Sequence, residues 1–245
     1  RGTRRPQNWL GFTSIIHTTI KTMDRQLTLL LNGSQSLFLD GVAWTATRTL
    51  TWIPLAIVLL YVVVRDNNLR GIWHVVLGIA LSILLADQMA SSVFKPLVAR
   101  WRPTHNPEIM YMVDVVNGYR GGNYGFFSSH ASNTWAIAMF VSLLARRRFL
   151  TISLASWALL NCWTRVYLGV HYVGDLAVGT LWGLFVGWAF YRLTVAGVVV
   201  EHHPLHIKHA LSPAANRMRP TSGKILVIAL LLTYLYIAFS ALFFC

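Results

Sequence analysis

Three polar residues, Arg165, His171 and Asp175, lie between two long apolar segments of the chain. His171 and Asp175 are four residues apart, so a helix that begins near His171 would place both side chains on one face. The carboxylate could then fix the tautomer of the imidazole and stabilise its charged form, as expected of an oriented nucleophile or base. Arg165 precedes His171 across a turn that contains Gly169, and its planar guanidinium suits a phosphate group. This stretch therefore predicts chemistry on an anionic substrate.

Two further polar clusters lie at the ends of apolar segments: Lys95 with Arg102 and Pro103, and Ser128 with Ser129 and His130. The basic residues of the three clusters would provide three fixed positive charges. The serines, together with backbone N–H groups at the start of a helix near residue 130, would add an anion-binding helix N-terminus. Of the two histidines, one could attack phosphorus while the other protonates the departing oxygen. The clusters together predict a phosphate-binding catalytic site.

The combined pattern Lys95-x6-Arg102-Pro103, Ser128-x-His130 and Arg165-x5-His171-x3-Asp175 resembles the three-part motif of the type 2 phosphatidic acid phosphatase (PAP2) superfamily, over roughly residues 45–192. That family includes membrane lipid phosphatases and soluble vanadium haloperoxidases. The resemblance implies that His171 is the nucleophile that forms a phosphohistidine, that Asp175 orients it, and that His130 is the general acid for the leaving group. It further implies that no metal or other cofactor is used, and that the phosphoryl oxygens are bound by Lys95, Arg102, Ser128 and Arg165.

Three positions depart from the usual family pattern, the first being Phe127, which replaces a proline. Ser129 replaces a glycine and keeps the backbone N–H for the phosphate while adding bulk, and Thr164 replaces a serine and keeps a hydroxyl. Arg120, in the segment before the second cluster, is a candidate ligand for a second phosphate or a headgroup. The variant Phe-Ser-Ser-His-Ala-Ser at residues 127–132 resembles lipid A phosphatases and favours that substrate, with undecaprenyl pyrophosphate and phosphatidylglycerol phosphate next.

The composition is typical of an integral membrane protein. Hydrophobic residues make up 55% of the 245 residues and charged residues 12%, whereas soluble domains carry about 25% charged residues. The net charge of +13 could suggest a nucleic-acid partner, but the basic residues lie between apolar runs, so we expect no nucleic-acid binding. The two cysteines show neither metal-binding spacing nor a disulfide framework.

The apolar runs predict an all-α membrane bundle of about six spans, near residues 44–64, 72–94, 130–145, 149–164, 173–191 and 224–244. Residues 1–43 are expected to form an interfacial segment with an amphipathic helix, because charges interrupt their apolar positions. Residues 44–192 form the predicted catalytic core, and 193–245 a polar connector and the last span. Spans three and four are predicted to form an antiparallel hairpin around residues 146–148. A glycine face in the fifth span would allow close helix contact: Gly174, Gly179, Gly183 and Gly187.

The basic residues predict the orientation of the bundle. Ten lie on one side of the membrane by this span count: Arg65, Arg70, Arg146, Arg147, Arg148, Arg192, Lys208, Arg217, Arg219 and Lys224. Five lie on the other side, namely Lys95, Arg100, Arg102, Arg120 and Arg165. The positive-inside rule makes the first side cytoplasmic, so the predicted site faces the periplasm of a bacterial inner membrane. The basic N-terminal segment opposes this assignment, because parity also places it outside.

Two other functions use the same cluster of charges. A lipid-to-lipid phosphotransferase would use it while excluding water, and a non-catalytic protein that binds or flips lipid phosphates would need no histidine chemistry. The histidine-rich string at residues 201–209 resembles a metal site, but its Pro204 and the lack of cysteine favour a solvated interfacial segment.

Overall fold

The computed structural model describes residues 8–200 and 218–244, so the histidine-rich string at 201–209 lies outside the described residues. Every regular element within these ranges is helical, which confirms the predicted all-α fold. The α-helices are α1 (Asn8–Leu31), α2 (Leu37–Thr47), α3 (Ile53–Asp66), α4 (Leu69–Gln88), α5 (Lys95–Val98), α6 (Ser129–Ala145), α7 (Arg148–Tyr167), α8 (Val173–Val200) and α10 (Pro220–Ala241). Shorter elements are the 3₁₀ turns η1 (Thr49–Trp52), η3 (Pro103–His105) and η4 (Val116–Gly118), and the π-helical turn η2 (Met89–Phe94).

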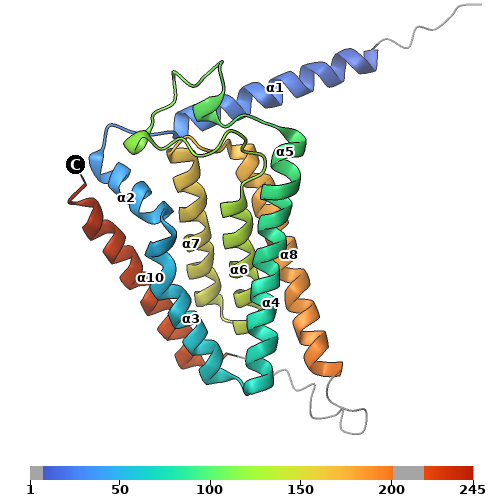
Figure 1. The fold of residues 1–245 in the computed structure, drawn as a ribbon, viewed down its shortest axis with the longest axis vertical. Helices are drawn as coiled ribbons and strands as arrows, with labels where there is room; N and C mark the ends of the chain where they lie inside the picture. Colours follow the sequence, from blue (N-terminus) through green and yellow to red (C-terminus); the bar gives the residue numbers. More distant parts are fainter. Residues whose placement is uncertain (1–7, 201–217, 245) are drawn as a thin grey trace, which may run out of the picture.

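The long helices run side by side, and α1 lies across one end of the bundle (Figure 1). Helix α6 is central and packs against α4, α7 and α8. The short helix α5 and the irregular segment 99–128 lie at the same end as α1 (Figure 1). This end carries the three polar clusters found in the sequence.

Within residues 8–200 and 218–244, four helical segments are long and apolar enough to cross a membrane, namely Thr49–Asp66, Leu69–Val98, Val173–Val195 and Pro220–Ala241. Helices α6 and α7 lie among them in the bundle, and the count of six spans stays a prediction. Two polar residues of α6 bond to α4, because Ser132 Oγ donates to Ala86 O at 3.2 Å and Asn133 Nδ2 to Asp87 Oδ1 at 3.1 Å. A central helix with such partners need not be uniformly apolar.

Two of the expected spans have different bounds in the structure. The first helical run starts at Leu37 and is interrupted at Arg48, whose backbone is extended (φ −77°, ψ 129°). The second continues past residue 94 through η2 and α5 and ends where Ala99 adopts a left-handed conformation (φ 48°). Lys95 therefore lies on a helix rather than beyond the end of the predicted span. The predicted domain limits at residues 43 and 192 fall inside α2 and α8.

The glycine face of α8 brings this helix against the backbone of α6. A Cβ atom would lie 2.6 Å from Ser128 O at Gly179, 2.3 Å from Ser132 O at Gly183 and 2.4 Å from Ala136 O at Gly187. Such distances are shorter than any van der Waals contact, so the two helices approach this closely only because the side chains are missing. Gly174 instead faces Asp24 of α1.

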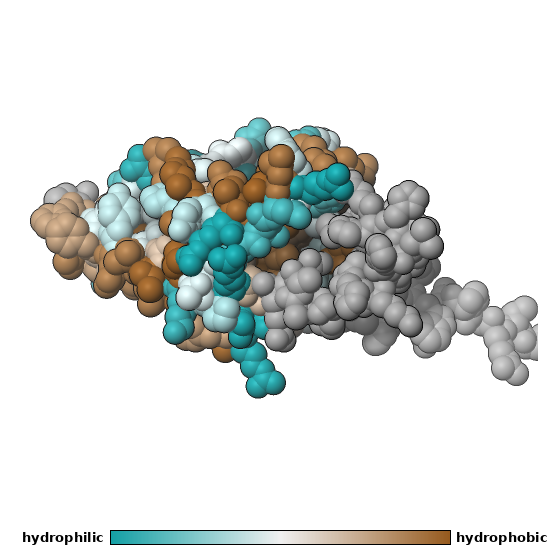
Figure 2. Space-filling view, turned by 90° about the horizontal axis from the view of Figure 1, so that it is seen from below, coloured by the Kyte–Doolittle hydropathy of each residue, from teal (hydrophilic) through white to brown (hydrophobic). Residues whose placement is uncertain are grey.

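Helices α6 and α7 form the predicted hairpin, with Arg146 in a left-handed conformation (φ 51°) between them. The hairpin turn lies toward the end of the bundle that also holds the α3–α4 connection (Figure 1). Hydrophilic side chains gather at this end between apolar flanks (Figure 2). Asp66 joins α3 to α10 here, because its carboxylate accepts from Ser222 Oγ at 2.8 Å and from the Arg219 N–H at 2.9 Å.

Helix α1 presents two different faces. Its exposed apolar side chains follow a helical spacing: Ile20, Met23, Leu27 and Leu30. Asp24 and Thr28 lie on the adjacent face and bond to the bundle. A helix that lies across the bundle end with an exposed apolar stripe has the amphipathic pattern expected of an interfacial segment.

Candidate active site

Four helix ends bring the predicted site residues to one end of the bundle. Lys95 begins α5, Ser128 caps α6, Arg165 lies in the last turn of α7, and His171 precedes α8. Although the clusters are separated in sequence by up to 80 residues, the antiparallel course of the helices places them together.

His171 is oriented by the turn between α7 and α8. Gly169 takes a left-handed conformation (φ +66°), and the His171 N–H donates to Arg165 O at 3.3 Å. His171 Nδ1 then lies 3.5 Å from Asp175 Oδ2, and this oxygen also accepts the N–H of Tyr172 at 3.1 Å. The two side chains are almost fully buried, with 1% and 0% exposed. Because Nδ1 faces the carboxylate, Nε2 is the nitrogen available to a substrate.

Burial keeps the His171 ring neutral. It lowers the pKa of His171 well below the usual value, and the nearby cations Arg102, Arg165 and Lys95 lower it further. At neutral pH the imidazole therefore carries no proton on one nitrogen, which is the state that a nucleophilic histidine requires.

The Arg165 guanidinium is held by residues from two other parts of the chain. Its Nη1 donates to Thr47 Oγ1 at the end of α2, and its Nη2 donates to Tyr119 Oη at 3.0 Å. The side chain is buried, and its Nε has no hydrogen-bond partner within the described part of the chain. A buried donor without a partner is costly, and an oxyanion ligand would satisfy it.

Lys95 is aimed at the start of α6. Its Nζ donates to Ser129 Oγ at 3.2 Å and to Ser91 Oγ at 3.3 Å. The π-helical turn η2 immediately precedes Lys95 and changes the angular position at which its side chain leaves the helix.

Arg102 is fixed by the segment that follows it in sequence. Its Nε donates to Tyr124 O at 3.1 Å, and its backbone N–H donates to Asn123 O at 3.0 Å. Gly121 passes so close that a Cβ there would lie 2.7 Å from Arg102 Nη1, and its φ of +67° also requires glycine. Burial lowers the pKa of Arg102 and Arg165 lowers it further, which indicates that two cations face the same space.

The N-terminus of α6 adds backbone donors. Ser128 Oγ accepts the N–H of Ala131 at 3.4 Å as an N-cap, while the Ser128 N–H donates to Asp175 O at 3.1 Å. The N–H groups of Ser129 and His130 are in the first turn, where a helix offers no internal acceptor. His130 is half-buried and interacts electrostatically with His171 and with the cations Lys95, Arg102 and Arg165.

A comparison with known families identifies the family to which the chain belongs. The sequence model described as the PAP2 superfamily matches residues 71–197, which contain all three polar clusters. The chain belongs to the PAP2 superfamily.

Two curated relatives of the PAP2 chain carry the same name. It is 42% identical to the lipid A 4′-phosphatase of Bacteroides thetaiotaomicron over 174 residues, which cover 70% of this chain and 77% of the relative. It is 37% identical to the lipid A 4′-phosphatase of Porphyromonas gingivalis over 174 residues, covering 71% and 74%. No solved structure matches the chain. The predicted class, a membrane lipid phosphatase acting on phosphoric monoesters, is confirmed.

Arg120, the candidate headgroup ligand, lies beside the PAP2 site rather than within it. Its side chain is exposed, and its Nη1 donates to Thr104 O at 3.0 Å. Burial lowers the pKa of His105, and the charges of Arg102 and Arg120 lower it further, so both arginines flank this ring. Arg120 thus occupies the outer rim, where a second anionic group of a substrate could reach it.

Three residues that the sequence did not single out also belong to the site: Arg100, Tyr119 and Thr47. Arg100 Nη1 donates to Asp175 Oδ1 at 2.7 Å, while Tyr119 and Thr47 hold Arg165. The only local signal for Arg100 is that it is a basic residue placed between Lys95 and Arg102. Nothing in the spacing of Thr47 or Tyr119 indicates a partner more than 40 residues away.

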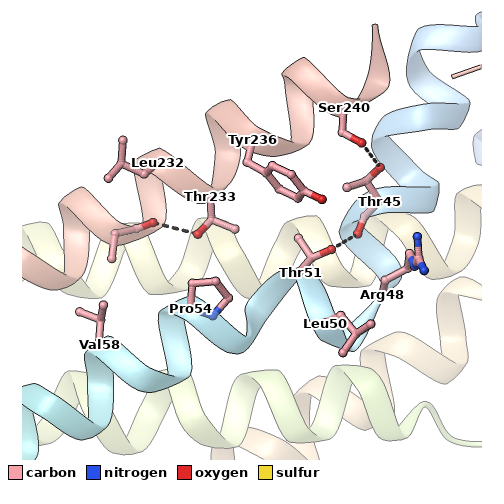
Figure 3. Close-up of a pocket in the computed structure, with 11 residues that line it drawn as sticks. Thr45, Arg48, Leu50, Thr51, Pro54, Val58, Leu232, Thr233, Tyr236 and Ser240 are labelled. Carbon is pink, nitrogen blue, oxygen red and sulfur yellow. Dashed lines mark hydrogen bonds between the residues drawn. The ribbon is translucent and has the colours of Figure 1, made fainter. Parts of the chain in front are cut away.

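A separate cavity of about 550 Å³ lies between α2, α3 and α10 (Figure 3). Arg48, which interrupts the helical run, lines it together with Thr51, Thr233 and Tyr236. None of the predicted catalytic residues lines it, so it is distinct from the site at the bundle end.

Proposed function

We propose that this membrane lipid phosphatase removes the 4′-phosphate of lipid A, at the periplasmic face of a bacterial inner membrane. The proposal depends on one observation. Three cations and two histidines converge at one bundle end, in a chain that is 42% identical to a lipid A 4′-phosphatase. The two named relatives favour lipid A over undecaprenyl pyrophosphate and phosphatidylglycerol phosphate.

The reaction proceeds in two steps, formation of a phosphohistidine and its hydrolysis. In the first, His171 Nε2 attacks phosphorus, the bond from phosphorus to the sugar oxygen breaks, and His130 gives that oxygen a proton. In the second, water attacks the phosphohistidine, His130 takes a proton from the water, and the P–N bond breaks to release orthophosphate and regenerate His171.

The charges of the site support this chemistry. Lys95, Arg102 and Arg165 would neutralise the phosphoryl oxygens as charge shifts onto them in the transition state. The unpaired Arg165 Nε and the first-turn N–H groups of α6 are donors that remain available for such oxygens. Asp175 faces His171 Nδ1 and would stabilise the imidazole as the new bond removes electron density from the ring.

The proposed orientation follows from the distribution of the arginines. Arg65, Arg70 and the arginines at 146–148 flank the α3–α4 and α6–α7 connections, at the end opposite the site. If this end is cytoplasmic by the positive-inside rule, the site faces outward. Helix α1 lies at the site end, so its basic residues are on the proposed outer side.

The test is phosphate release from lipid A by the purified full chain in lipid nanodiscs. We expect His171→Ala to lower the rate by at least about 10³-fold, because no other neutral nucleophile replaces it. His74→Ala serves as the matched control and should keep the wild-type rate, since His74 lies near the start of α4, beside the α3–α4 connection at the end of the bundle opposite the site. Undiminished release by His171→Ala would overturn the mechanism.

Two measurements separate the alternative functions. The wild-type protein, quenched during turnover, should carry an acid-labile and base-stable phosphate, which a binding or flipping protein would not form. Orthophosphate should appear in stoichiometric amounts with dephosphorylated lipid, whereas a phosphotransferase would pass the phosphoryl group to a second lipid. A higher rate on undecaprenyl pyrophosphate or phosphatidylglycerol phosphate than on lipid A would refute the proposed substrate.

A further inference from the structure

Arg100 connects the catalytic carboxylate to the helix that lies across the bundle end. Its Nη1 donates to Asp175 Oδ1 at 2.7 Å and its Nη2 donates to Asp24 Oδ2 of α1 at 2.6 Å. The guanidinium also stacks on Tyr172, with Cζ 4.0 Å from the ring centroid. Although burial lowers the pKa of Arg100, the carboxylates of Asp175 and Asp24 outweigh it and raise the pKa above its usual value. Arg100 is therefore charged and immobilised on three sides.

Helix α1 also caps the start of α8. Asp24 Oδ1 accepts the N–H of Gly174 at 2.8 Å, and Thr28 Oγ1 accepts the N–H of Val173 at 3.2 Å. Both acceptors come from a helix about 150 residues earlier in the chain, and they satisfy N–H groups that the first turn of α8 cannot pair internally. A Cβ on Gly174 would lie 2.9 Å from Asp24 Oδ2, so this contact requires glycine.

The two oxygens of Asp175 have different partners. Arg100 donates to Oδ1. Oδ2 accepts from the Tyr172 N–H and lies opposite His171 Nδ1. A carboxylate can rotate about its last bond, and a charge-assisted hydrogen bond to one oxygen fixes that rotation. The bond from Arg100 to Oδ1 thus acts with the Tyr172 N–H on Oδ2 to determine where the oxygen that faces His171 lies.

We propose that Arg100 and Asp24 are positioning residues, which hold Asp175 in the orientation that faces His171 and make α1 a part of the catalytic assembly. The inference rests on the proposed role of His171 as nucleophile. Neither residue is assigned a contact with the phosphoryl group. Their loss should therefore lower kcat, while KM should change little.

The experiment compares Arg100→Gln and Asp24→Asn with a control on the same helix. Arg25 neighbours Asp24 in α1 and pairs with Glu108 instead of the site, so Arg25→Gln removes a comparable ion pair. With p-nitrophenyl phosphate and with lipid A, we expect Arg100→Gln to lower kcat about 10- to 100-fold with KM within about threefold, since a hydrogen bond to a charged group is at stake. Arg25→Gln should stay near wild type.

Two further variants distinguish positioning from simple structural damage. Arg100→Lys keeps the charge and one donor, so it should recover part of kcat. The double variant Asp24→Asn/Arg100→Gln should be no slower than Arg100→Gln alone, because both act through one chain of contacts. Thermal melting is measured for each purified protein, and the rates are compared at equal folded fraction.

The outcomes are separable from those of the proposed function. An unchanged kcat in Arg100→Gln, an increase in KM alone, or a loss no greater than in Arg25→Gln would overturn the positioning role. If wild-type protein hydrolyses p-nitrophenyl phosphate but not lipid A, the proposed substrate fails while the comparison of variants still decides the role of Arg100. If His171→Ala retains activity, the nucleophile assignment fails, and the positioning role fails with it.

Discussion

Lys95 Nζ lies 3.2 Å from Ser129 Oγ, although 34 residues separate them in the chain. This contact joins the end of the second membrane segment to the first turn of α6, where His130 follows immediately. A cation is thereby placed beside backbone donors that have no internal acceptor, which is a favourable setting for an oxyanion. A substitution of Lys95 therefore tests whether this end of the bundle binds phosphate.

Removal of the Lys95 charge should slow phosphate release. We expect Lys95→Ala to lower kcat/KM about 10²- to 10³-fold, as is typical when one group that stabilises transition-state charge is lost. Ser129→Ala should cost less than about tenfold, because the backbone N–H of residue 129 remains. Kinetics on lipid A measure both variants, and equal losses would show that the Lys95–Ser129 bond matters more than the charge.

The pH dependence should report the His171 ring. Burial and three cations lower the pKa of His171, so the neutral nucleophile persists as the pH falls below 6.5, and the acid limb of kcat/KM should lie below that pH. Arg102→Gln removes the cation with the largest effect on the pKa of His171 and should raise that pKa, which moves the acid limb to higher pH. Both profiles use one substrate, so its own titration contributes equally, and an unmoved limb would contradict the assignment.

The hydroxyl of Tyr119 should matter because it holds Arg165. Tyr119→Phe leaves Arg165 Nη2 without its acceptor, and a hydrogen bond to a charged group contributes roughly 1.5 to 3 kcal/mol. We expect kcat/KM to fall by about tenfold or more. Tyr111→Phe is the matched control, since Tyr111 is 86% exposed. A loss in both variants alike would indicate a general effect of removing tyrosine hydroxyls.

Contact between α6 and α8 should limit stability. Gly183→Ala places a Cβ 2.3 Å from Ser132 O, so the helices must separate, at a cost of about 1 to 3 kcal/mol. Gly223→Ala in α10 is the control, because no atom lies within 4 Å of its Cβ position. Thermal melting in detergent should show a lower midpoint for Gly183→Ala and an unchanged or higher one for Gly223→Ala. A melting curve of Gly183→Ala identical to wild type would refute this packing.

Chelation should leave the enzyme active. Lysine and arginine side chains provide the positive charge that a metal would otherwise supply, so phosphate release should be unchanged after dialysis against EDTA. Vanadate should inhibit, because a trigonal-bipyramidal oxyanion on His171 imitates the transferring phosphoryl group. Activity that disappears with EDTA and returns with a divalent cation would contradict the metal-free mechanism.

Local patterns were enough to predict the helical fold and much of the packing. The glycine spacing of α8 predicted close contact with another helix, and Arg146 to Arg148 predicted the hairpin turn. The π-helical turn before Lys95 and the interruption at Arg48 were missed, because neither changes the average hydropathy of a segment. Helix boundaries in apolar runs are set by backbone hydrogen bonds, which periodicity does not reveal.

The candidate site was predictable to the extent that its residues recur at fixed spacings. The two histidines and Asp175 could be singled out because such charges are costly between apolar segments. Arg100 could not be singled out, since its partners Asp24 and Asp175 are each about 75 residues away in the sequence. Pairings across such separations depend on how helices are arranged in space, and no local rule reports them.

Gly179 is a residue outside the site that sets a distance between two helices of the site. The carbonyl of Ser128, one residue before the turn that carries His130, would be 2.6 Å from a methyl group at that position. The distance between His130 on α6 and His171 ahead of α8 therefore depends on the absence of a side chain at Gly179. A methyl group added there would push α6 and α8 apart. The direction from which His171 approaches phosphorus would change, while every reacting group stayed the same.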